Sequence, residues 1–95
     1  MITLNLNLPV LDPEGKPIDA PTTLGRVLSG QLLGVAKGNV MKFFCWGMDF
    51  YQDKPVMVDD ADFKTITTVV EESQQLSNLV KGRILNAMEA CRKQP

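Results

Sequence analysis

The chain has 95 residues, of which 44% are hydrophobic, and its 10 basic and 11 acidic residues give a formal net charge of -1. This length and composition predict one globular domain over residues 1–95 and exclude a disordered chain, which would be poor in aliphatic residues and highly charged. The balanced charge excludes the positive field that attracts polyanions, so nucleic acid is disfavoured as the main partner.

The first 21 residues are predicted to be extended and turn-rich. Residues 2–8 alternate between aliphatic and polar side chains, which is the period of a half-buried strand. Residues 12–17 (DPEGKP) combine turn-forming residues and predict a reversal of the chain. The segment 17–21 is expected to pair with the first strand as an edge, because prolines cannot donate within a ladder. Residues 55–58 predict a further short strand that adds Val56 and Val58 to the first one.

Four helices are predicted from apolar spacing and capping residues, at approximately 23–37, 40–52, 60–72 and 76–92. Thr22 or Thr23 is the expected cap of the first helix. Its three internal glycines each cost about 0.5 to 1 kcal/mol relative to alanine, so this helix must depend on packing and close backbone approach. Asp59 is the expected cap of the third helix.

These elements predict an α+β fold in which four helices pack with a small N-terminal sheet. The expected core consists of the residues that lie on the apolar stripes of these elements: Leu4, Leu6, Leu28, Leu32, Phe43, Phe63, Ile66, Val70, Val80, Ile84 and Ala87. The two cysteines, Cys45 and Cys91, are too few for a disulfide framework and lie in apolar helical patterns. We interpret both as reduced core thiols.

No sequence feature predicts catalysis, a cofactor or a metal site. The chain contains no histidine, the side chain best suited to proton transfer near neutral pH. The carboxylates of Asp59, Asp60 and Asp62 lack the glycine and distal glutamate of a calcium loop, and we interpret them as a helix cap with acidic residues matched to the helix dipole. Cys45 has no partner in the sequence that would lower its pKa. We therefore expect a protein that is not an enzyme.

The segment 43–51 contains five of the six aromatic residues of the chain. A helix with apolar residues around most of its circumference is either central in a small domain or a surface for a partner. Tryptophan, tyrosine and methionine are enriched at interface cores, which favours a contact surface along part of this helix. The candidate interaction residues are Met41, Phe44, Trp46, Met48 and Tyr51.

The N-terminus lacks the basic region and continuous apolar stretch of a secretory signal, and no run approaches the ~20 apolar residues of a membrane span. We therefore expect a cytoplasmic protein without membrane contact. The basic residues near the C-terminus, at positions 81, 83, 92 and 93, form no dense stripe and have no interleaved aromatic residue. Such residues are typical of a solvated helix surface rather than of a single-strand binder.

Four short segments distributed over nearly the whole chain carry a family resemblance. They are LDPEGKPI at 11–18, TLGRVL at 23–28, VDDADF at 58–63 and NLVKGRIL at 78–85. This succession resembles small uncharacterised proteins of tailed bacteriophages and prophages. The resemblance implies a phage-encoded accessory or assembly protein in a bacterial host, in the cytoplasm or associated with the virion. It carries over no catalytic or binding residue.

The leading functional hypothesis is an accessory or assembly protein that binds itself, as a homo-oligomer, or a phage assembly component. One alternative is a small inhibitor that binds a host enzyme. A second alternative is a nucleic-acid-binding accessory factor, which the balanced charge makes the weaker of the two.

Overall fold

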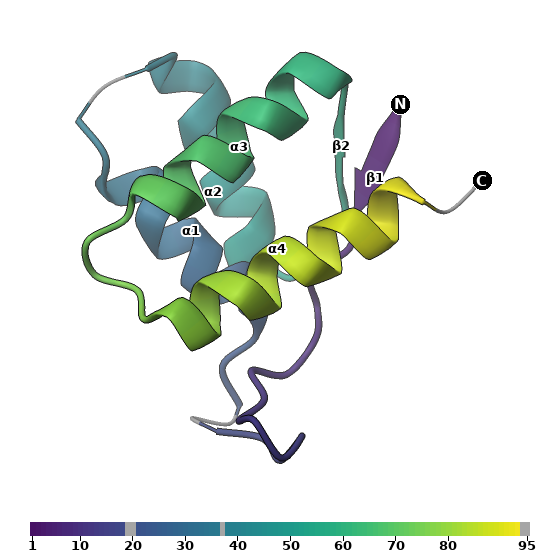
Figure 1. Cartoon of the computed structure of the whole chain (residues 1–95). Coiled ribbons are helices and arrows are strands. Elements are labelled where there is room, and N and C mark those ends of the chain that lie inside the picture. Colours follow the sequence, from purple (N-terminus) through teal and green to yellow (C-terminus); the bar gives the residue numbers. More distant parts are fainter. Residues whose placement is uncertain (19–20, 37, 94–95) are drawn as a thin grey trace.

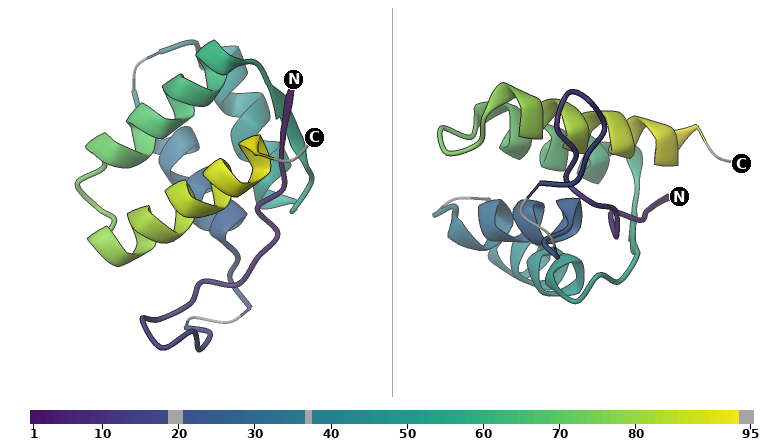
Figure 2. Two further views of the ribbon diagram at one scale, coloured as in Figure 1. Left: turned by 45° about the vertical axis from the view of Figure 1, so that its right-hand side comes forward. Right: turned by 90° about the horizontal axis from the view of Figure 1, so that it is seen from below.

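The computed structural model describes residues 1–18, 21–36 and 38–93, and within these ranges the chain forms four helices and two short strands (Figure 1). In chain order they are β1 (Ile2–Leu4), α1 (Leu24–Gly34), α2 (Val40–Tyr51), β2 (Val56–Val58), α3 (Asp60–Glu72) and α4 (Asn78–Arg92). Figure 2 shows α1 and α2 as one layer, α3 and α4 as the other, and the two strands at one end. The predicted α+β class is confirmed.

The strands pair in antiparallel orientation, with Ile2 opposite Val58 and Leu4 opposite Val56. All four of these side chains are buried, which confirms that the second strand adds Val56 and Val58 to the first. The first strand is shorter than the predicted 2–8. Its continuation leaves the ladder, because the carbonyl of Leu6 accepts instead from the N–H of Gly25 at the start of α1.

Within its described residues, 17, 18 and 21, the segment after the turn does not pair with residues 2–8, so the prediction is corrected for these residues. Leu11 instead forms an isolated bridge with Pro17, and the N–H of Ile18 donates to the carbonyl of Val10 at 2.8 Å. The turn itself is confirmed: Oδ1 of Asp12 accepts from two backbone N–H groups within it. Residues 19 and 20 of the predicted segment lie outside the described residues.

Helix α1 begins after its cap Thr23, whose hydroxyl accepts from the N–H of Arg26. It ends at Gly34, earlier than the predicted 37, and position 37 lies outside the described residues. Two neighbouring backbone segments approach α1 closely at Gly25. A Cβ at this position would lie 3.2 Å from the carbonyl oxygen of Phe50 and 3.3 Å from that of Leu6, so this close backbone contact favours glycine.

Capping residues start the remaining helices at or near their predicted first residues. Asn39 caps α2, and Asp59 caps α3 by accepting the N–H of Asp62 at 2.7 Å, which confirms the interpretation of the acidic cluster as a cap. Helix α4 begins two residues later than predicted, because Ser77 is its cap and Leu76 precedes it. Among the described residues, no group of three acidic or cysteine side chains is placed to hold a metal ion.

The predicted core is largely confirmed, with corrections in α4 and at one cysteine. Val80 and Ala87 are only partly buried, and Met88 is the fully buried residue of that helix beside Ile84. Cys45 is exposed, contrary to its interpretation as a core thiol. Its position on α2 faces away from α1, so no neighbouring element covers it. No helix in the described ranges is long and apolar enough to cross a membrane.

Candidate functional site

Helix α2 packs on the core with one side of its circumference. Phe43, Trp46, Gly47 and Phe50 are buried and fall within about 100° of the helical wheel. The rings of Phe43 and Trp46 are in contact, with centroids 5.7 Å apart. The absence of a side chain at Gly47 leaves the space that Leu33 of α1 occupies. This face binds α2 to the rest of the fold.

A second apolar arc of α2 remains exposed, and we call it the α2 apolar face. It consists of Val40, Met41, Phe44, Met48 and Tyr51, which are 77%, 65%, 52%, 37% and 58% exposed. These positions also fall within about 100° of the wheel, and this arc adjoins the buried one, with Val40 next to Gly47. None of them is charged. The α2 apolar face is therefore a continuous neutral surface on a well-packed helix.

The structure brings together four of the five predicted interaction residues and separates the fifth. Trp46 is only 8% exposed, so its assignment to the contact surface is corrected. It lies on the buried arc, where its ring contacts Phe43. Val40 was not among the predicted residues, although its place on the wheel, next to Tyr51 and Phe44, was the signal that would have included it.

Tyr51 is held in place at the C-terminal end of the α2 apolar face. The guanidinium of Arg26 lies 5.7 Å from the centre of its ring, and Nε of Arg26 donates to the Tyr51 carbonyl at 3.2 Å. Arg26 also forms an ion pair with Asp53, whose Oδ1 accepts from the hydroxyl of Thr23 at 2.7 Å. Contacts from the start of α1 therefore hold this end of α2 in a defined position.

A polar edge borders the α2 apolar face on its other side. Going around the wheel from Met41, the next positions are Cys45, Asp49 and Lys42. Nζ of Lys42 lies 3.0 Å from Oδ1 of Asp62. This hydrogen bond, with the attraction between the two charges, raises the pKa of Lys42 above its ordinary value of 10.5.

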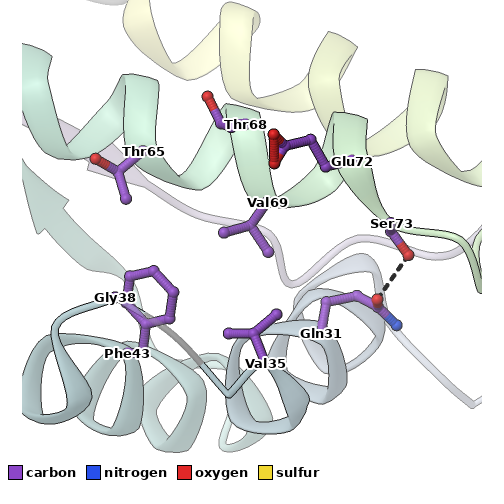
Figure 3. Close-up of a pocket in the computed structure, with 9 residues that line it drawn as sticks. All are labelled: Gln31, Val35, Gly38, Phe43, Thr65, Thr68, Val69, Glu72 and Ser73. Carbon is purple, nitrogen blue, oxygen red and sulfur yellow. Dashed lines mark hydrogen bonds between the residues drawn. The ribbon is translucent and has the colours of Figure 1, made fainter.

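A pocket of about 460 Å³ lies beside Phe43, between α3 and the α1–α2 layer (Figure 3). Its walls are apolar where Val69 of α3 points toward Val35 and Phe43, and polar around the rim. The lining residues are Gln31, Val35, Gly38, Phe43, Thr65, Thr68, Val69, Glu72 and Ser73.

The polar groups of this pocket for which the structure shows hydrogen bonds stabilise the fold. The hydroxyls of Thr65 and Thr68 donate to carbonyls one turn earlier in α3. The hydroxyl of Ser73 donates to Oε1 of Gln31 at 2.7 Å, and this bond links the ends of α1 and α3 (Figure 3). The pocket is thus mainly an apolar space whose hydroxyl and amide groups join helices. It shows no pair of a nucleophile and a base among its described lining residues.

Together these features define a four-helix α+β domain in which one helix carries a buried and an exposed apolar face. No protein-family model matches the chain, and comparisons with curated proteins and with solved structures found no significant match.

Proposed function

We propose that this protein is a non-catalytic accessory or assembly protein of a tailed phage, and that it acts by binding another protein chain through the α2 apolar face. The single observation that carries this proposal is the continuous exposure of five large apolar side chains on one helix. Together they leave on the order of 500 Å² of apolar surface in water, an area at which exposed patches commonly mark interaction sites.

The packing of α2 supports a functional origin of this exposure. The helix already buries Phe43, Trp46 and Phe50, so its attachment to the fold does not depend on the outer arc. Water-exposed apolar residues on such a helix add nothing to the core and increase the risk of aggregation. The absence of charge within the arc matches the depletion of charged residues at interface cores.

The phage part of the proposal is supported by the resemblance of segments 11–18, 23–28, 58–63 and 78–85 to small phage and prophage proteins. We propose the cytoplasm of a bacterial host, or association with the virion, as the location of the protein. An inhibitor of a host enzyme would use the same apolar face, and the identity of the captured partner separates the two roles.

Affinity capture from phage-producing cells tests the proposal. The tagged wild type is compared with Met41→Glu and with the control Met57→Glu, which changes a methionine of similar exposure (62%) on β2. We expect the wild type and Met57→Glu to retain a phage structural or assembly protein and Met41→Glu to lose it. Retention of the same partner by Met41→Glu would contradict the role of this face. A host enzyme in its place would favour the inhibitor, and DNA released steeply by salt would favour a nucleic-acid factor.

A further inference from the structure

We propose that the pocket between α3 and the α1–α2 layer binds a small, uncharged aromatic molecule. Phe43, the residue of α2 that lines this pocket, belongs to the buried arc and not to the α2 apolar face, so the two sites are separate. The volume of about 460 Å³ lies within the range of about 300 to 1,000 Å³ that is typical of small-molecule sites. A cavity of about 150 Å³ lined by aliphatic and aromatic side chains already holds benzene, so this pocket has room for two fused rings.

The apolar walls of the pocket face one another across open space. Val69 of α3 points toward Val35 and Phe43 of the opposite layer, and both valines remain partly exposed (Figure 3). Side chains in a protein interior normally close such a gap, because each wall loses dispersion contacts when no atoms lie opposite it. A flat ring between the two walls would restore contacts on both of its faces.

The ring of Phe43 is held in a fixed position at one of these walls. It packs against Gly38, where a Cβ would lie 2.9 Å from Cζ of the ring, and it contacts the indole of Trp46 at a centroid distance of 5.7 Å. The hydrogen bond from Ser73 to Gln31 joins the ends of α3 and α1 beside the pocket. The apolar walls are therefore in place before a ligand binds.

The polar groups of the pocket favour an uncharged ligand. The hydroxyls of Thr65, Thr68 and Ser73 each have one proton, and all three donate it to protein acceptors. Among the described lining residues none is basic, and Glu72 is the one acidic residue. A carboxylate on the ligand would therefore meet no positive charge among these residues and would lie near a like charge. An ammonium would lose its water against the apolar walls, a cost that a neutral ring does not have.

Methyl NMR of the full chain during a titration with indole tests the site. We expect saturable binding with a dissociation constant of about 1 mM or lower, in which the methyl signals of Val35 and Val69 shift. The methyl signals of Val56 and Val58 in β2 are the control and should stay fixed. Indole-3-acetate carries the same ring with a carboxylate, and it should bind at least about fivefold more weakly.

A variant that fills the pocket provides the second test. Val69→Phe places a ring in the open space and should weaken indole binding about tenfold or more. Val80→Phe is the control, because it makes the same change at a partly buried valine of α4 outside the pocket. Circular dichroism verifies that both variants are folded, and the methyl shifts of the wild type decide the question if Val69→Phe is not.

Three results would overturn the proposal. They are fixed signals of Val35 and Val69 at indole concentrations several times the expected dissociation constant, shifts at Met41 and Met48 of the α2 apolar face in their place, and equally tight binding of indole-3-acetate. None of these results bears on the proposed function, because affinity capture tests the α2 apolar face without a small molecule.

Discussion

Leu33 of α1 occupies the space where Gly47 of α2 has no side chain: a Cβ at Gly47 would lie 2.5 Å from Cγ of Leu33. This contact fixes how α1 and α2 pack against each other. It also determines which side of α2 faces the core and which side remains in water.

Gly47→Ala should therefore destabilise the fold, although alanine is the better helix former. We expect a loss of about 1 to 2 kcal/mol in the free energy of unfolding, because the new methyl group forces Leu33 to move. Gly30→Ala is the control: Gly30 lies in the interior of α1 with open space around it, so this substitution should stabilise by about 0.5 to 1 kcal/mol. Chemical denaturation measures both. Equal stabilisation by the two substitutions would show that Leu33 does not restrict position 47.

Substitutions of two phenylalanines in α2 distinguish the roles of its buried and exposed faces. Phe50 is 1% exposed and Phe44 is 52% exposed. Phe50→Ala should lower the free energy of unfolding by about 3 to 5 kcal/mol, because it leaves a cavity in the core. Phe44→Ala should change the stability of the monomer by about 0.5 kcal/mol or less. The comparison is made by denaturation at low protein concentration, and a large loss for Phe44→Ala there would place that residue in the core of the single chain.

The ion pair between Lys42 and Asp62 should appear as a difference in stability at alkaline pH. Folding raises the pKa of Lys42, mainly through its hydrogen bond to Asp62, so the protonated lysine stabilises the fold. That contribution is complete below the ordinary value of 10.5 and is lost as the pH rises through the raised pKa. The stability difference between wild type and Lys42→Met, measured by denaturation, should shrink above this pH. A difference that stays constant would show that the charge on Lys42 is not involved.

Local signals predicted α2 and α3 well, because each helix has a strong cap, Asn39 and Asp59, in front of a regular apolar pattern. The prediction placed the start of α4 two residues too early, because Leu76 fits the apolar period. Ser77 is the residue that caps the helix. The alternation of residues 2–8 predicted the buried side of the chain as far as Leu6. It did not show where the ladder ends, because the start of α1 competes for the same carbonyl groups.

The candidate site was predicted as a helix with excess apolar surface, and the division of that surface required the tertiary structure. A wheel gives the angular positions of Trp46 and Tyr51 equally well, but it does not show which of them faces α1. The contact of Gly47 with Leu33 turns Trp46 inward and leaves Tyr51 outside, next to Arg26. Such a choice depends on residues more than ten positions apart, which no local pattern contains.

The most direct measurement of binding through the α2 apolar face is an NMR titration of the full chain with the protein that it captures, observed at the methionine methyl groups. Met41 and Met48 lie on this face, Met57 is exposed on β2, and Met88 is buried in the core. If that partner binds at α2, the methyl signals of Met41 and Met48 should shift as it is added, while those of Met57 and Met88 stay fixed. Unchanged signals of Met41 and Met48, or shifts centred on Met57, would contradict the proposed surface.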